Sequence, residues 1–187
     1  IEYLTFTDFK DANTAQHYIL KCHPGYFCAP QVFYFTPHKK WYMICQAASD
    51  SWQPNYQPAY STTDDIAEPN SWSTLTPLFE QKPANVKAWL DFWVICDDNK
   101  AHLFFTSLDG NMWRAETSLA KFPHGWSTPA IALSGDVFEA SHTYYLKGLS
   151  KYLTLIEAQN GYGWRYYKAY LSDRLDGVWQ PLAADKE

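Results

Sequence analysis

Two carboxylate residues lie inside apolar, strand-like segments, where a charged side chain is costly unless it has a partner or a task. Asp91 lies near the start of the segment Leu90–Cys96, and Glu139 lies between Phe138 and Ala140 at the start of another segment. They are 48 positions apart, close to the repeat length of the chain, so we expect them to project from equivalent places on neighbouring units. Two carboxyl groups facing one site suit glycoside hydrolysis, in which one acts as acid and the other as base or nucleophile.

The apolar neighbours of Glu139 favour the acid role for this residue. Desolvation raises the pKa of a carboxyl group, so Glu139 is expected to hold its proton at a pH where an exposed carboxyl is charged. The alternative is that each carboxylate only satisfies backbone amides or an arginine in the core, and the residues alone leave both interpretations open. Glu157, on a middle strand, is expected to form a structural ion pair with Arg165 or Arg114.

The composition argues against several classes of protein. The chain has 187 residues, of which 47% are hydrophobic and 19% charged, which is typical of a globular domain rather than a disordered segment. A net charge of −5 argues against a nucleic-acid surface, and no apolar run reaches the roughly 18–20 residues of a membrane span. The 9 Trp, 14 Tyr and 11 Phe residues suit either sugar binding or strand packing, and composition does not separate these uses.

Cysteine and histidine spacing predicts no metal site. The sequence has no Cys-x-x-Cys pair, and its six histidines lack the spacing of metal ligands. Cys22 and Cys28 flank a short turn-like segment and could either close a disulfide or remain as buried thiols. Cys45 and Cys96 lie in apolar strand-like segments, where a free thiol packs as a small hydrophobic group.

A repeat marked by tryptophan organises the chain. Trp72, Trp126 and Trp179 occur in similar contexts at spacings of 54 and 53 residues. Between these marks, short β-type segments alternate with turns, and no long helical period is present. The predicted strands are 31–35, 41–46 and 59–63, then 90–96, 101–107 and 112–116, then 138–146, 152–158 and 164–171.

Three strands and a closing fourth in each repeat predict an all-β fold of the β-propeller type. The alternative is a β-sandwich in which the tryptophan spacing arises by chance. We expect a single, partial propeller over residues 1–187, with approximate units at 1–20 (partial), 28–82, 88–135 and 136–184. These units amount to about three and a half blades, whereas closed propellers have about four to eight. Another chain or a further segment is therefore expected to complete the propeller.

Around the two carboxylates, and along almost the whole chain, the sequence resembles glycoside hydrolase family 62. The matching stretches are Cys28–Phe35 with Trp41, Leu90–Asp91 with Asp97–Asp98, Leu103–Phe105, Asp109–Ala115, Phe122–Pro123, Phe138–Ala140, Tyr152–Leu153, Ile156–Ala158, Arg165–Tyr167 and Trp179. Members of this family are α-L-arabinofuranosidases, five-bladed β-propellers that remove arabinose branches from arabinoxylan with inversion. The resemblance implies an extracellular hydrolase acting on an arabinoxylan-like polysaccharide or oligosaccharide.

The resemblance also assigns roles to individual residues. Glu139 would be the general acid that protonates the leaving oxygen, and Asp91 would raise the pKa of this acid and orient it. The segments that line or support the substrate-binding pocket contain four further residues, Gln46, Phe92, Arg165 and Tyr166. Phe92 stands where many members have Gln, and Ala47 where many have Trp, so we expect a different substrate preference.

Further components of such an active site are implied outside this sequence. The family's catalytic base is an Asp in an N-terminal blade, which would precede Ile1, and more pocket residues would follow Glu187. Residues 1–187 alone are therefore not expected to turn over substrate. No organic cofactor is implied, but a structural calcium at the centre of the propeller is. The rival prediction is a non-catalytic carbohydrate-binding or structural propeller module that lacks the base.

Overall fold

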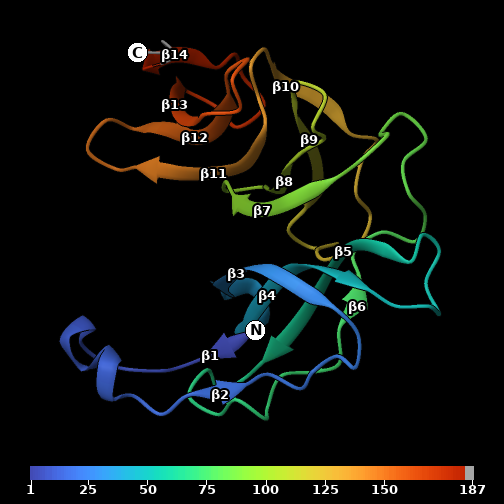
Figure 1. Ribbon diagram of the computed structural model, residues 1–187, viewed down its shortest axis with the longest axis vertical. Helices are drawn as coiled ribbons and strands as arrows, with labels where there is room; N and C mark the ends of the chain where they lie inside the picture. The colour runs from blue at the N-terminus through green and yellow to red at the C-terminus, as the bar shows by residue number, and fades with distance from the viewer. Residues whose placement is uncertain (184–187) are drawn as a thin grey trace. The chain divides into compact units, whose positions relative to one another are not determined.

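The computed structural model of the protein describes residues 1–183 and consists mainly of antiparallel β-sheet (Figure 1). It contains three four-stranded sheets and one two-stranded sheet, which confirms the predicted all-β class. The chain divides into two compact units, Ile1–Leu78 and Phe79–Glu187. Residue 184, at the end of the last predicted blade unit, lies outside the described residues. Within residues 1–183, no helix is long and apolar enough to cross a membrane. The number of blades stays a prediction.

The first unit contains one four-stranded sheet and one short strand pair. The sheet has the order β3-β4-β5-β6, and β1 pairs with β2. Two short 3-10 helices complete the unit. The elements are β1 (Glu2–Tyr3), η1 (Phe9–Thr14), β2 (Tyr18–Ile19), β3 (Phe27–Phe35), η2 (Thr36–His38), β4 (Lys40–Ala48), β5 (Tyr56–Thr63) and β6 (Thr76–Pro77).

Strand β4 forms the centre of this unit because it is buried on both faces. Met43 and Cys45 on one face pack with Trp72, the first of the repeated tryptophans. Cys22 and Cys28 are free thiols in the structure, which answers the question that their spacing left open, and Cys45 is a buried free thiol. Packing of strand side chains, rather than a disulfide, therefore holds this unit together.

The second unit consists of two four-stranded sheets, each in sequential strand order. The predicted inner three strands of both sheets are present, with ends that differ by a few residues. The first sheet contains β7 (Leu90–Cys96), β8 (Lys100–Thr106), β9 (Asn111–Ser118) and β10 (Ala130–Ser134). The second contains β11 (Glu139–Leu146), β12 (Lys151–Gln159), β13 (Arg165–Ser172) and β14 (Gln180–Ala183).

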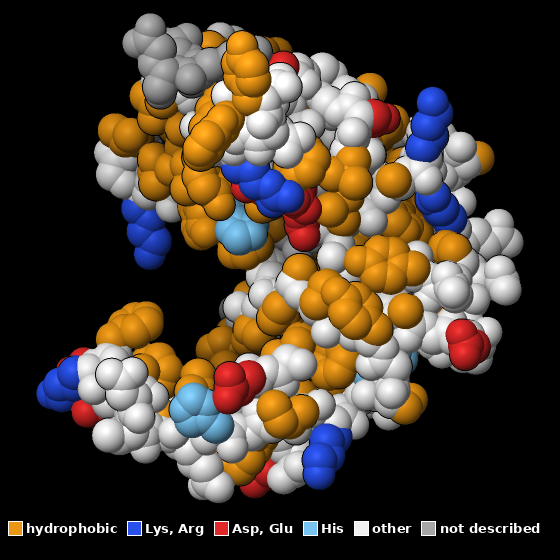
Figure 2. Space-filling model, viewed as in Figure 1, with side chains coloured by type: hydrophobic (Ala, Val, Ile, Leu, Met, Phe, Trp, Pro, Cys, Tyr) orange, Lys and Arg blue, Asp and Glu red, His pale blue; other side chains and the backbone are white. Residues whose placement is uncertain are grey.

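The two sheets of the second unit share one hydrophobic core. Phe104 and Met112 from the first sheet pack with Ile156 and Tyr170 from the second, and Trp179 belongs to the same cluster. Strand β11 also packs against β7. On the face shown in Figure 2, further hydrophobic side chains gather over the sheet of β11–β14. The shared core fixes β7 and β11 as neighbours, and these are the strands that carry Asp91 and Glu139.

Beside this core, His102 on β8 is a buried imidazole that the structure holds in its neutral form. Its side chain is 1% exposed, and its Nδ1 lies 3.1 Å from Nη1 of Arg114, which can only donate. Nδ1 therefore accepts, and Nε2 carries the proton that it donates to Oδ2 of Asp97 at 2.8 Å. Burial lowers the pKa of His102, and the Arg114 charge acts in the same direction.

This depressed pKa predicts a loss of stability in mild acid. Unfolded His102 takes up a proton as the pH falls through its ordinary pKa of 6.5, whereas the folded state resists protonation, so the free energy of unfolding decreases below that pH. Urea unfolding between pH 8 and pH 5 measures this effect. The His102→Gln variant keeps an acceptor and a donor but does not titrate, and its stability should vary less with pH. Identical pH slopes for the two proteins would contradict the assignment.

Candidate active site

The first strand of each four-stranded sheet contains the same irregularity, a bulge with one extra residue. Pairing skips between Cys28 and Gln31 in β3, between Leu90 and Trp93 in β7, and between Glu139 and His142 in β11. In each bulge the residue after the last paired one has a positive φ. These residues are Ala29 (49°), Asp91 (54°) and Ala140 (55°). Such bulges redirect side chains at sheet ends, and they recur next to active sites.

The bulges correct the predicted equivalence of the two carboxylates. Asp91 corresponds to Ala140, and Glu139 corresponds to Leu90, so the expected match is wrong by one residue. The side chains still come together, because the ends of β7 and β11 are neighbours. Oδ2 of Asp91 accepts a hydrogen bond from the Ala140 N–H at 2.8 Å. Asp91 is therefore tied to the backbone directly beside Glu139.

Arg165, the first residue of β13, links Glu139 to a second carboxylate. Its Nη1 lies 2.7 Å from Oε1 of Glu139 and 3.1 Å from Oε2 of Glu157. The strand order β11-β12-β13 explains this contact, because Glu139 pairs directly with Glu157 across the sheet. The Arg165 guanidinium also lies 4.5 Å from the centre of the Phe138 ring. The predicted ion pair of Glu157 is confirmed, and of its two expected partners, Arg165 and Arg114, it is Arg165 that forms it.

Burial and the neighbouring charges together raise the pKa of Glu139. Burial is the largest cause, and the neighbouring Asp91 charge raises the pKa further. Arg165 acts in the opposite direction, while Glu157 adds to the rise. The side chain of Glu139 is 22% exposed, so its carboxyl group is accessible while partly desolvated. A carboxyl of this kind can hold a proton and donate it to a bound molecule.

Removing the positive charge of Arg165, which pairs with both Glu139 and Glu157, should destabilise the sheet. Arg165→Met keeps an apolar contact with Phe138 but leaves Glu157, which is 7% exposed, without its ion-pair partner. We expect a loss of about 1–3 kcal/mol at pH 7, at the lower end because half of the Arg165 side chain is in water. The loss should shrink at pH 4, where carboxyl groups begin to take up protons. Chemical unfolding at both pH values measures it.

A matched control for this prediction is Arg174→Met. Arg174 pairs with Asp176 on the surface, and its side chain is 74% exposed. Its replacement should change stability by no more than about 0.5 kcal/mol at either pH. Equal effects of the two substitutions would show that the Arg165 cluster has no special energetic role.

Comparison with known proteins identifies the chain. The family described as "Glycosyl hydrolase family 62" matches residues 1–187. The chain belongs to glycosyl hydrolase family 62. A curated relative, α-L-arabinofuranosidase C of Cellvibrio japonicus (strain Ueda107), is 40% identical over 188 residues, covering 97% of this chain and 28% of that protein.

Solved structures of family 62 resemble the chain closely. An α-L-arabinofuranosidase from Podospora anserina, in complex with cellotriose, has 39% identity and a TM-score of 0.87, covering 99% of this chain and 59% of its own. The catalytic domain of the Coprinopsis cinerea family 62 enzyme has 36% identity and the same TM-score, covering 99% and 60%. A family 62 hydrolase in complex with xylotriose has 39% identity and a TM-score of 0.83, covering 97% and 60%. The chain thus spans about three fifths of these relatives.

More distant structures share the fold alone. An α-L-arabinofuranosidase of family 43 from Clostridium thermocellum has 16% identity and a TM-score of 0.64, covering 82% of this chain and 50% of its own. This likeness supports the architecture of packed antiparallel sheets. It does not assign residues.

The remaining residues predicted for the family 62 pocket lie in different surroundings. Gln46 is on β4 in the first unit, where its amide nitrogen lies 3.4 Å from Sγ of Cys28. Tyr166 follows Arg165 on β13, and its hydroxyl lies 3.4 Å from Oδ2 of Asp136. Phe92 is 2% exposed and packs against Trp89 and Phe105. Phe92 is therefore a packing residue in this structure, because no face of its ring is open to a sugar.

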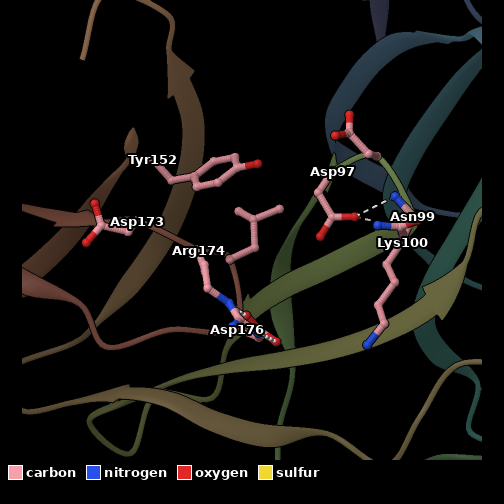
Figure 3. Close-up of a pocket in the computed structure, with 9 residues that line it drawn as sticks. Asp97, Asn99, Lys100, Tyr152, Asp173, Arg174 and Asp176 are labelled. Atoms are coloured by element: carbon pink, nitrogen blue, oxygen red, sulfur yellow. Dashed lines mark hydrogen bonds and ion pairs between the residues drawn. The ribbon is translucent and has the colours of Figure 1, made fainter. Parts of the chain in front are cut away.

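A pocket of about 350 Å³ lies at the other end of β7 from Asp91 (Figure 3). Tyr152 and Arg174 line one side of it, and Asp97 and Lys100 line the other. The charged groups that line the pocket bind neighbouring residues. Oδ1 of Asp97 accepts hydrogen bonds from the backbone N–H groups of Asn99 and Lys100 at 2.8 and 2.7 Å. Arg174 pairs with Asp176. The pocket is thus separate from the carboxylate cluster and contains no residue of it.

The structural calcium is implied by the family resemblance alone. No group of three or more His, Cys, Asp or Glu side chains within residues 1–183 is arranged to hold a metal ion. The calcium at the centre of the propeller stays a prediction.

Proposed function

We propose that this chain supplies the acid side of the active site of an inverting α-L-arabinofuranosidase. The whole protein would remove arabinose side chains from arabinoxylan or a related polysaccharide outside the cell. The observation that carries this proposal is Glu139, a partly buried carboxyl with a raised pKa, between Asp91 and Arg165. Membership of family 62, and relatives named as arabinofuranosidases at 36–40% identity, support it.

In the proposed mechanism, Glu139 donates its proton to the glycosidic oxygen as the bond to arabinose breaks. A water molecule, activated by a base, attacks the anomeric carbon from the opposite face, so that the configuration inverts in one displacement. Asp91 keeps the acid protonated at higher pH and fixes the backbone beside it. Gln46 and Tyr166 are proposed to contact the substrate. We assign no base among residues 1–183.

The architecture proposed for this enzyme is a five-bladed propeller. The three four-stranded sheets would be blades within the units 28–82, 88–135 and 136–184, with a partial unit at 1–20. The common bulge at the start of β3, β7 and β11 supports this division, because repeated units should share their irregularities.

The test is the release of arabinose by the full-length protein. Incubation with arabinoxylan should liberate free arabinose, and proton NMR at early times should find it as the β-anomer, as inversion requires. Retention on a xylan column without any arabinose release would instead indicate a non-catalytic carbohydrate-binding module.

A further inference from the structure

Two aromatic side chains in the hairpin between β12 and β13 are almost fully exposed. Tyr162 is 91% exposed and Trp164 is 73% exposed, among the highest values of the large hydrophobic residues in the described chain. They lie in the connection between Gln159, the last residue of β12, and Arg165, the first residue of β13. Tyr and Trp are enriched in binding interfaces because each combines a large apolar face with a polar group at one edge.

The hairpin holds both residues in a defined backbone conformation. Oδ1 of Asn160 accepts the N–H groups of Tyr162 and Trp164 at 3.0 and 3.1 Å. The backbone N–H of Asn160 donates to the carbonyl of Trp164 at 3.0 Å, and the N–H of Gly163 donates back to the Asn160 carbonyl at 2.9 Å. Gly163 has a φ of 82°, which a larger residue rarely adopts. Because the turn is ordered before binding, little conformational entropy is lost when a ligand contacts it.

The strand pairing puts this hairpin at the same end of the sheet as the proposed acid. Gln159 pairs with Arg165, and the hairpin connects these two residues directly. Arg165 in turn lies 2.7 Å from Glu139. Glu157, the direct partner of Glu139 across the sheet, is two positions before Gln159. The hairpin that carries the two aromatic residues therefore extends from the end of the sheet at which Glu139 lies.

We propose that Tyr162 and Trp164 form an aromatic platform that stacks against sugar rings of the polysaccharide main chain, next to the branch that is removed. Residues 159–164 carry no charged side chain, which suits a neutral polysaccharide better than a charged partner. Flat rings that are apolar on their faces and polar at one edge match the apolar face and hydroxyl rim of a pyranose. This proposal rests on the proposed function. It gives the enzyme a second contact with its substrate, to the polysaccharide main chain rather than to the arabinose branch.

The experiment compares a polymeric with a small substrate, using the full-length protein. The Tyr162→Ala/Trp164→Ala double variant should raise KM for arabinoxylan by about tenfold, equivalent to about 1.4 kcal/mol, with kcat nearly unchanged. Hydrolysis of 4-nitrophenyl α-L-arabinofuranoside should not change, because this substrate has no main chain. Trp164→Phe should keep most of the affinity. The matched control is Leu149→Ala, which removes a side chain that is 61% exposed in the turn at the other end of this sheet.

Electrophoretic retardation in gels containing arabinoxylan measures binding without turnover. The double variant should migrate faster than the wild type in these gels, and Leu149→Ala should not. If the wild type releases arabinose but the double variant keeps its KM and retardation, the platform is refuted while the proposed function stands. If the wild type releases no arabinose, the proposed function fails, and retardation alone decides on the platform. Unchanged retardation with a changed oligomeric state would assign the rings to a second copy and overturn the proposal.

Discussion

Glu139→Gln is expected to lower kcat on arabinoxylan by about 10²–10⁴-fold, the usual contribution of a general acid. Glutamine has nearly the same shape as glutamate and can still accept a hydrogen bond from Arg165, but it has no acidic proton to transfer to a glycosidic oxygen. Glu157 still pairs with Arg165 in the variant, so the cluster keeps an ion pair. The fold should therefore survive, and the loss should fall on kcat more than on KM.

The leaving group provides a sharper measurement than the loss of rate alone. Aryl α-L-arabinofuranosides with acidic phenols need little protonation as they leave, whereas a sugar hydroxyl needs it fully. The variant should therefore be close to wild type on the most acidic phenols and fall behind progressively as the phenol pKa rises. Glu116→Gln, at another carboxylate of the same unit, serves as the control. Equal losses for every leaving group would mean that Glu139 does not act as the acid.

The strands could be predicted because their signals are local. Alternating or continuous apolar runs bounded by turn residues define Leu90–Cys96 without any knowledge of distant contacts, and β7 has these same bounds. The bulges could not be located in this way. A bulge is defined by the pairing with the next strand, which the sequence does not show. A spacing of 48 residues therefore looked equivalent, although the position that matches Asp91 is Ala140.

The charged residues of the candidate site could be predicted, but not that Glu139 shares its cation with Glu157. Glu157 was expected to pair with Arg165 or Arg114, yet only the alignment of β11 with β12 places Glu157 opposite Glu139. The aromatic hairpin was missed for a different reason. Its turn signal was clear, and aromatic residues inside a polar turn were available as a signal of exposure, but abundant aromatics elsewhere serve the core, as Phe92 does.

Asp91→Asn is expected to shift the pH dependence of activity to lower pH. Asparagine keeps an oxygen that accepts the Ala140 N–H and tolerates the positive φ of 54° at this position, so the change mainly removes a charge. That charge raises the pKa of Glu139, so the acid loses its proton at a lower pH in the variant. The basic limb of the kcat/KM profile should therefore shift to lower pH. Each pH unit of this shift lowers kcat/KM about tenfold at pH values above the limb.

Two further variants test whether Asp91 acts through the pKa of Glu139. Arg165 lowers the pKa of Glu139, so the activity that remains in Arg165→Met should have its basic limb at higher pH, the opposite direction. Asp91→Ala also loses the hydrogen bond to Ala140 and should lose activity at every pH. Because Asp91→Asn keeps that bond, its activity below the basic limb should match the wild type. A loss that is the same at all pH values would mean that Asp91 acts on the substrate directly, rather than through the proton of Glu139.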